Sequence, residues 1–195
     1  MRKQLQRLLN RGVLWIQRTS EVARFDGIAI ADYRNRSSHF RDTVLAALDL
    51  IKRTDARRFA RVKRQLKWIV NSTLRVPGMA DYYHGTQTCR IDFVEPAPGS
   101  DAEYPIGSCA STIIHEATHG VVACRNIAYS KKLRSRIERL CVFEEQRFLI
   151  HLTITRPALA TSLYHEYDPA RWKDSWAITP FQNLTAILRR IAFGS

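Results

Sequence analysis

Residues 108–126, SCASTIIHEATHGVVACRN, hold two histidines four positions apart, His115 and His119, with Glu116 directly after the first. The apolar residues around them recur at the spacing of one helical face, with serines that can cap the start and an asparagine that can end the last turn. This pattern predicts a helix over residues 109–125. Residues four apart lie on the same side of a helix, so both imidazoles can reach a single ion.

The motif fits a catalytic zinc site. Imidazole nitrogens bind zinc at about 2.0–2.1 Å, and the spacing of His115 and His119 suits that geometry. Glu116 is rotated by about 100° from His115, so it does not ligate beside the pair but can reach a water on the open side of the metal. Zinc lowers the pKa of such a water to about 7, while Glu116 accepts its proton and returns it to the leaving amine. Hydrolysis of a peptide bond needs these two functions.

A catalytic zinc ion usually has three protein ligands, so the histidine pair requires a third. A second helix is predicted over residues 131–153, and it carries Glu144 and Glu145 in the segment CVFEEQRF. The apolar stripe of that helix is centred midway between the two glutamates, so periodicity alone does not choose between them. We predict Glu145 as the ligand, because Phe148 would then pack beneath it against the first helix, and we keep Glu144 as the alternative.

These segments resemble the gluzincin type of zinc peptidase, in which the two histidines of HExxH and a downstream glutamate hold zinc. The resemblance is closer to small bacterial peptidases with the motif HEATH, whose function is uncharacterised. It rests on STIIHEATHG and RIERLCVFEEQRF and covers residues 40–153. It implies the ligands and the base named above, and an edge strand over residues 88–94 that holds an extended substrate.

The chain also departs from other zinc peptidases. Val122 and Arg125 stand where the metzincin continuation has glycine and histidine, and the asparagine–glutamate signature of thermolysin-like enzymes is missing. Gly120, directly after the motif, has two explanations. It either admits close helix packing beside the metal or is a simple weak point of the helix.

Stabilising an oxyanion needs a hydrogen-bond donor opposite the zinc. The downstream candidates are Tyr129, Tyr164 and His165, although tyrosines are also common as half-buried packing residues. Trp172 and Trp176 can wall a substrate cleft or pack in the core, and we favour core packing.

The rest of the chain predicts a mainly helical α+β fold. Apolar residues recur at helical spacing over residues 40–51 and again over residues 59–70, after which a segment with proline and glycine ends the second helix. Residues 79–95 contain two β-prone runs separated by HGTQT, which predicts a hairpin. Beyond residue 156 we expect a short helix, an ordered loop and a last helix that starts near Pro180.

No linker divides the chain into two folded units. We predict a single small zincin-like domain, a minigluzincin, over residues 39–195, in which a short hairpin or edge strand lies beside the active-site helix. Residues 1–38 are predicted to be a basic N-terminal helix or extension docked on that domain.

The chain is strongly basic, with 31 Lys and Arg against 18 Asp and Glu and a net charge of +13. The excess is concentrated in residues 2–18, 52–67 and 131–139, and each of these segments has helical spacing of apolar residues. Solvated helix faces explain such runs, and nucleic acid, an anionic membrane surface or an acidic protein are the partners that they would fit. The outer face of the second helix carries Arg57, Arg61, Arg64 and Lys67.

The sequence has no run of about 18 apolar residues, so we expect no transmembrane segment. Its N-terminus lacks the continuous apolar core and the cleavage site of a secretion signal. The four cysteines are widely spaced and form no CxxC pair, which predicts reduced, partly buried thiols and a cytoplasmic location. They are Cys89, Cys109, Cys124 and Cys141.

We therefore predict a zinc metallopeptidase that cuts a peptide or an extended protein segment. Two alternatives stay open. One is a non-catalytic basic module on a zincin-like scaffold that binds nucleic acid or an acidic partner. The other is hydrolysis of a non-peptide amide, because the same zinc chemistry does not identify the acyl group.

Overall fold

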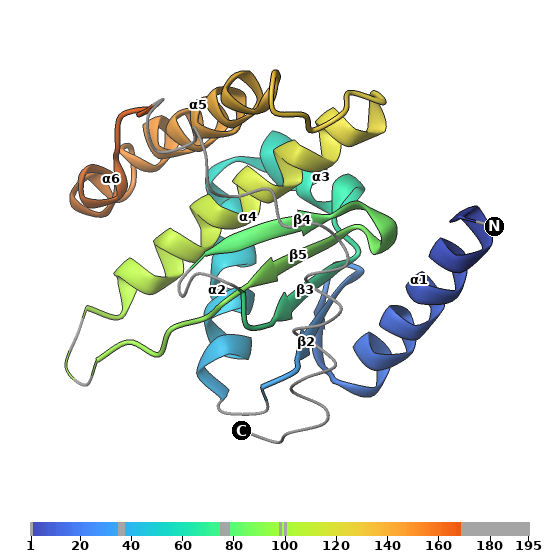
Figure 1. Cartoon of the computed structure of the whole chain (residues 1–195). Helices are drawn as coiled ribbons and strands as arrows, with labels where there is room; N and C mark the ends of the chain where they lie inside the picture. Colours follow the sequence, from blue (N-terminus) through green and yellow to red (C-terminus); the bar gives the residue numbers. More distant parts are fainter. Residues whose placement is uncertain (1, 35–37, 75–78, 98, 100, 169–195) are drawn as a thin grey trace.

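A computed structural model describes residues 2–34, 38–74, 79–97, 99 and 101–168 (Figure 1). Its strands are β1 Glu21–Phe25, β2 Ile28–Asp32, β3 Trp68–Asn71, β4 Ala80–Tyr83 and β5 Thr88–Ile91. Its helices are α1 Arg2–Thr19, α2 Ser38–Thr54, α3 Ala56–Gln65, α4 Glu103–Cys124, α5 Arg134–Leu152 and α6 Pro157–Leu163, with a 3-10 helix, η1 His84–Thr86, between β4 and β5. The predicted α+β fold, mainly helical, is confirmed.

The strands form one sheet in the order β1-β2-β3-β5-β4. The three central strands β2, β3 and β5 are parallel, and β1 and β4 pair antiparallel at the two edges. Every residue of β2 and β3 is buried. Such burial on both faces is typical of parallel strands, which are covered by helices on both sides.

Side chains alternate between two cores on either side of the sheet. Ile28, Ile30 and Ile69 point into the larger core, which α2, α3, α4, α5 and α6 complete. Ala31 and Val70 point the other way, where α1 contributes Leu14. Figure 1 shows that, of the described helices, α1 lies on the side of the sheet opposite α2 and α4.

Helix α4 occupies the centre of the larger layer. It packs against α2, α3, α5, α6 and the edge strand β4. Ile113, Ile114 and Ala117, from the middle of α4, are almost completely buried in the core. Because the HExxH segment lies in this middle part, its side chains are held by packing on nearly every side.

Two predicted elements are wrong in their bounds. The second helix was expected to run through residues 59–70, but α3 ends at Gln65 and Leu66 takes an extended conformation, with φ −112° and ψ 127°. The apolar run that follows becomes the interior strand β3, since a short buried strand and a buried helix segment look alike in periodicity. The edge strand was expected over residues 88–94, but β5 pairs on both sides, with β3 and β4, and β4 forms the edge.

The predicted domain division is also different in the structure. Residues 21–32 were assigned to an N-terminal extension, but they supply β1 and β2, and β2 pairs with β3 inside the sheet. Within the described part of that extension, residues 2–34, α1 is the segment that lies against the sheet as a docked helix. The hairpin of residues 79–95 and the short helix after residue 156 are confirmed as β4–β5 and α6. Trp172, Trp176 and the last predicted helix lie outside the described residues.

Over the part of the chain that the structure describes, no helix has both the length and the apolar character needed to cross a bilayer. All four cysteines are free thiols; Cys124 is exposed, and Cys89, Cys109 and Cys141 are buried. The prediction that the cysteines are partly buried is therefore confirmed.

Gly120 is a point of close approach between helices. A Cβ atom at this position would lie 2.8 Å from Cβ of Gln65 in α3 and 3.3 Å from Cζ of Tyr82 in β4. Contacts with a Cβ atom cannot be relieved by a side-chain rotation. Of the two explanations for this glycine, close packing is the one that the structure supports.

We expect Gly120→Ala to lower the free energy of unfolding by about 1–3 kcal/mol, because α4 must move away from α3. Gly12→Ala is the matched control, since Gly12 also lies within a helix and a Cβ there meets nothing within 4 Å. The control should be neutral or more stable by up to about 1 kcal/mol. Urea unfolding of the two variants measures the difference, and equal effects would exclude the close packing as its cause.

Candidate metal centre

Helix α4 presents His115 and His119 on one face, toward α5. The two ring centroids are 5.0 Å apart, and the side chains are only 12% and 15% exposed. One turn of helix separates the rings, as the spacing in the sequence requires. Both imidazoles therefore face the same small region between α4 and α5.

Glu138 of α5 lies against both rings. Its Oε2 is 3.1 Å from Nε2 of His115, and its Oε1 is 3.5 Å from Nε2 of His119. The carboxylate is 2% exposed, so it is almost completely buried. Two imidazole nitrogens and one carboxylate thus converge from two helices.

Glu145, the predicted third ligand, contacts the opposite nitrogen of the first histidine. Its Oε1 is 2.5 Å from Nδ1 of His115, and its Oε2 accepts a hydrogen bond of 3.1 Å from Oγ of Ser111. A carboxylate at Nδ1 fixes the orientation of an imidazole whose Nε2 is used elsewhere. The structure thus brings Glu145 to the histidine pair, at the outer side of the ring.

Glu144, the alternative ligand, belongs to a different cluster. Its carboxylate pairs with Arg61, with Arg58 at 3.3 Å and with Arg147 at 3.1 Å. These arginines hold the pKa of Glu144 below its usual value although burial acts to raise it. Its carboxylate therefore ties α5 to α3 instead of facing the histidines.

Cys141 is a further donor near the pair. Among the described residues, His115, His119 and Cys141 each place one potential ligand atom within 4.8 Å of the others. Burial raises the pKa of the Cys141 thiol far above its usual value, with the nearby carboxylates adding to the effect. A thiol binds metal as the thiolate, so the ionised Glu138 is the better third donor.

Glu116 lies in the same buried region with one oxygen unused. Glu116 is only 4% exposed, and its Oε2 has no hydrogen-bond partner among the described residues. Burial raises the pKa of Glu116 to about 7, although His119 and His115 act to lower it. A carboxylate with a pKa near neutral is suited to accept and return a proton.

The charged groups around His115 shift one another's pKa values. Burial acts to lower the pKa of His115, but its hydrogen bonds with Glu138 and Glu145 outweigh burial and raise the pKa well above the usual value of 6.5. Burial acts to raise the pKa of Glu138, but His115 and His119 pull it well below the usual value. Without a metal, the two carboxylates therefore favour the imidazolium form of His115.

Of the three predicted oxyanion donors, Tyr129 lies at the site. Its hydroxyl donates a hydrogen bond to Oε1 of Glu138, and its ring contacts that of His119 at 5.5 Å. Tyr164 is 55% exposed at the end of α6, and His165 contacts Leu163 and Gln146. In the described part of the chain neither forms a hydrogen bond or ring contact with the histidine pair.

Glu138 was not among the predicted residues. It lies 19 positions after His119 and seven before Glu145, which places it two turns away on the same side of α5. That spacing was a usable signal, since Cys141 lies between the two glutamates on the same stripe. Glu138 lies beside Arg136 and Arg139, in the basic segment 131–139 that was explained by a solvated helix face.

Comparisons with family models, with curated proteins and with solved structures each found no match.

The metal-free protein should show an unusually basic His115. We expect a pKa well above 6.5 for this ring and a fall toward 6.5 in Glu138→Gln, because one of the two carboxylates that favour the imidazolium is removed. NMR titration of ring signals after chelation measures it, and Glu144→Gln, which changes a carboxylate bound to arginines, is the control. Because the pKa of His115 is higher in the folded protein than in the unfolded chain, protonation of this ring stabilises the fold. The stabilisation is complete below the unfolded pKa of about 6.5 and is lost as the pH rises through the raised, folded-state pKa. A His115 pKa of 6.5 or lower in the parent protein would contradict this electrostatic account.

Proposed function

We propose that the chain is a zinc-dependent metallopeptidase. The observation that carries the proposal is the convergence of Nε2 of His115, Nε2 of His119 and the carboxylate of Glu138, with the buried Glu116 beside them. Two imidazoles and one carboxylate are a ligand set of catalytic zinc sites that leave a fourth position open. We assign Glu138, in place of Glu145 or Glu144, as the third ligand.

The surroundings of these residues fit a divalent cation. Three carboxylates are buried here: Glu138 and Glu145 contact His115, and Glu116 interacts electrostatically with His115 and His119. Such a concentration of acid needs a compensating positive charge. Glu145 would orient His115 through Nδ1, as carboxylates commonly do for histidines that bind metal. When bound, zinc supplies a Lewis acid that polarises the scissile carbonyl and acidifies the attacking water.

The chain itself would move the proton. Glu116 accepts a proton from the attacking water at Oε2, the oxygen that has no partner among the described residues, and then delivers it to the leaving amine. Its pKa of about 7 suits both halves of this transfer near neutral pH. Tyr129 is the donor that we assign to the developing oxyanion; its single hydroxyl proton, which is donated to Glu138 in this structure, would turn to the oxyanion when the Glu138 carboxylate holds zinc.

The substrate would be an extended peptide. β4 lies at the edge of the sheet and packs against α4, the helix that carries the histidines. Extended peptides bind by adding a strand to such an edge, with main-chain hydrogen bonds that do not depend on sequence. We propose β4, instead of residues 88–94, as the strand that holds the substrate, and the four free thiols suit a cytoplasmic enzyme.

Two substitutions test the chemistry. Glu116→Gln should retain about one zinc ion per chain and lose activity by about 10²-fold or more, because the amide cannot accept the proton. His115→Ala should lose the zinc itself. Metal analysis of the purified proteins, together with cleavage of a fluorogenic peptide mixture, measures both properties. Full activity of Glu116→Gln at normal zinc content would exclude the proposed mechanism.

A second set of variants tests the ligand assignment. Glu138→Gln should abolish tight zinc binding, because a neutral amide oxygen replaces a direct ligand. Glu145→Gln should weaken zinc binding by about 10- to 100-fold, the effect of losing a carboxylate that orients a ligand. Glu144→Gln is the matched control on the same helix and should keep the zinc affinity of the parent. Competition with a fluorescent zinc chelator gives the three affinities; if Glu145→Gln lost more affinity than Glu138→Gln, the assignment would be reversed.

A further inference from the structure

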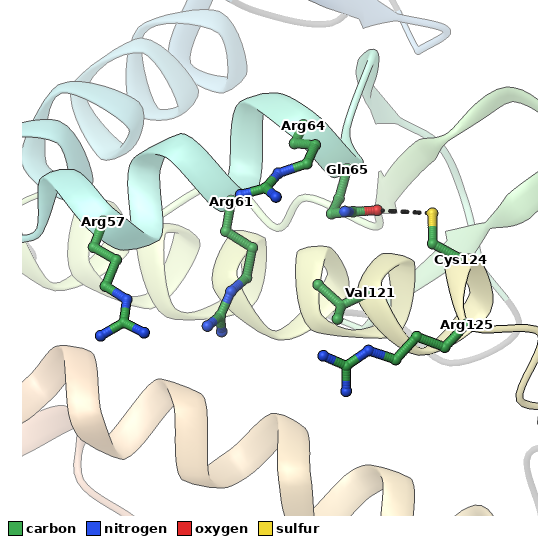
Figure 2. Close-up of a pocket in the computed structure, with 7 residues that line it drawn as sticks. All are labelled: Arg57, Arg61, Arg64, Gln65, Val121, Cys124 and Arg125. Atoms are coloured by element: carbon green, nitrogen blue, oxygen red, sulfur yellow. Dashed lines mark hydrogen bonds between the residues drawn. The ribbon is translucent and has the colours of Figure 1, made fainter.

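A groove lies on another side of α4, between α3 and α5. It has a volume of about 520 Å³ and is lined by four arginines together with Gln65, Val121 and Cys124. Figure 2 shows Arg57 and Arg61 pointing from α3 toward α5, while Arg125, at the end of α4, reaches into the same space. Val121 is rotated by about 200° from His119 around α4, so the groove is separate from the candidate metal centre.

The groove carries positive charge that the neighbouring acids do not compensate. Within the described residues, Arg57, Arg64 and Arg125 form no ion pair. Arg61 pairs with Glu144, but that one carboxylate is shared with Arg58 and Arg147. A cluster of guanidinium groups with so few counter-charges attracts an anionic ligand.

The arginines follow the helix at a regular spacing. Arg57, Arg61 and Arg64 lie at positions i, i+4 and i+7 of α3, so successive side chains are separated by about 4.5–6 Å along its axis. In an extended peptide, alternate side chains on one face are about 6.6–6.8 Å apart. Acidic residues at alternate positions can therefore meet successive arginines.

The floor of the groove favours a peptide over a nucleic acid. It is formed by Val121 and Cys124, where the Cys124 thiol donates a hydrogen bond of 3.2 Å to Oε1 of Gln65. Sites for single-stranded nucleic acid use aromatic side chains on which bases stack, and none of the described residues that line this groove is aromatic. Small apolar side chains between glutamates would instead contact this floor.

From these observations we infer that the groove between α3 and α5 binds an acidic, extended polypeptide segment, with its carboxylates on Arg57, Arg61, Arg64 and Arg125. Guanidinium groups bind carboxylates through paired hydrogen bonds, which gives such a site direction as well as charge. The inference is independent of zinc and of peptide hydrolysis. It gives a specific location to an acidic protein, one of the three kinds of partner that the basic segments of the sequence would fit.

The full-length Glu116→Gln protein is suited to the test, because it should not cleave the probe. The probe is a fluorescein-labelled peptide of about seven residues with glutamate at alternate positions among alanines. The control peptide has glutamine in place of each glutamate. Fluorescence anisotropy should show binding of the glutamate peptide alone, weakened by added salt. Bound peptide should also slow alkylation of Cys124 by iodoacetamide, because this thiol lies in the groove and is the exposed one of the four cysteines.

A matched pair of triple variants locates the binding. A variant that combines Arg57→Gln, Arg64→Gln and Arg125→Gln should bind the glutamate peptide at least about tenfold more weakly. This is the effect of losing one charge-assisted hydrogen bond or more. Arg11→Gln, Arg18→Gln and Arg136→Gln remove the same charge from exposed positions outside the groove and should have little effect. Equal weakening in both triples, or an unprotected Cys124, would overturn the proposal. So would an oligodeoxythymidine that binds through the groove arginines while the acidic peptide does not.

Discussion

The burial of three carboxylates beside two imidazoles is the constraint on which the centre of this structure depends. Glu116, Glu138 and Glu145 are only 4%, 2% and 6% exposed. Each buried ion costs several kcal/mol of lost hydration unless an opposite charge lies close to it. The histidines of α4 must therefore face the acids of α5, and the crossing of the two helices is fixed by charge compensation as well as by apolar packing.

A second ionic cluster holds α5 in the register that this pairing needs. Arg58 pairs with Asp55, and its Nε donates a hydrogen bond of 3.2 Å to the backbone oxygen of Glu144. Asp55 also accepts from the backbone N–H of Arg58 at the start of α3, and it contacts Nδ1 of His151 at 2.8 Å. The cluster thus joins the first turn of α3 to the middle and the end of α5. Because a helix is rigid over two turns, fixing residue 144 also fixes where Glu138 lies along α4.

The elements that the sequence predicts well are those with long, regular periodicity. The segments around HExxH and CVFEEQRF repeat every three to four residues over several turns, and both are helices. The second has nearly the expected bounds, whereas α4 begins at Glu103, six residues before the expected start at residue 109. The strand Trp68–Asn71 was predicted as part of the preceding helix, because four consecutive buried residues show no alternation that would distinguish a strand from a helix. β1 and β2 were missed for a related reason: a short strand is defined by the neighbours with which it pairs, and those lie far away in the sequence.

The candidate site divides in the same way between local and long-range information. His115, Glu116 and His119 could be named from the sequence, because a single helix determines their relative positions. Glu145 could also be named, but its position relative to the imidazoles could not, because Glu138 and Glu145 lie two turns apart on one side of α5. Only the point at which the helices cross decides which of them faces Nε2 and which faces Nδ1 of His115. Periodicity determines which side of α5 is buried. The point along α5 at which α4 crosses it depends on contacts between residues far apart in the sequence, such as those of His115 with Glu138 and of Arg61 with Glu144.

The two sides of α4 separate the charges of this basic chain. The side toward α5 borders the buried acids Glu138 and Glu145 of that helix, and the side toward α3 borders the arginines of the groove. Between them lies the apolar interior of the helix, with Ile113 and Ala117 fully buried. A negatively charged segment is repelled by the first side unless a cation occupies it, and is attracted by the second whatever the first contains. Residues about 200° apart on a helix point to nearly opposite sides of it. Helix α4 therefore separates two surfaces of opposite electrostatic character.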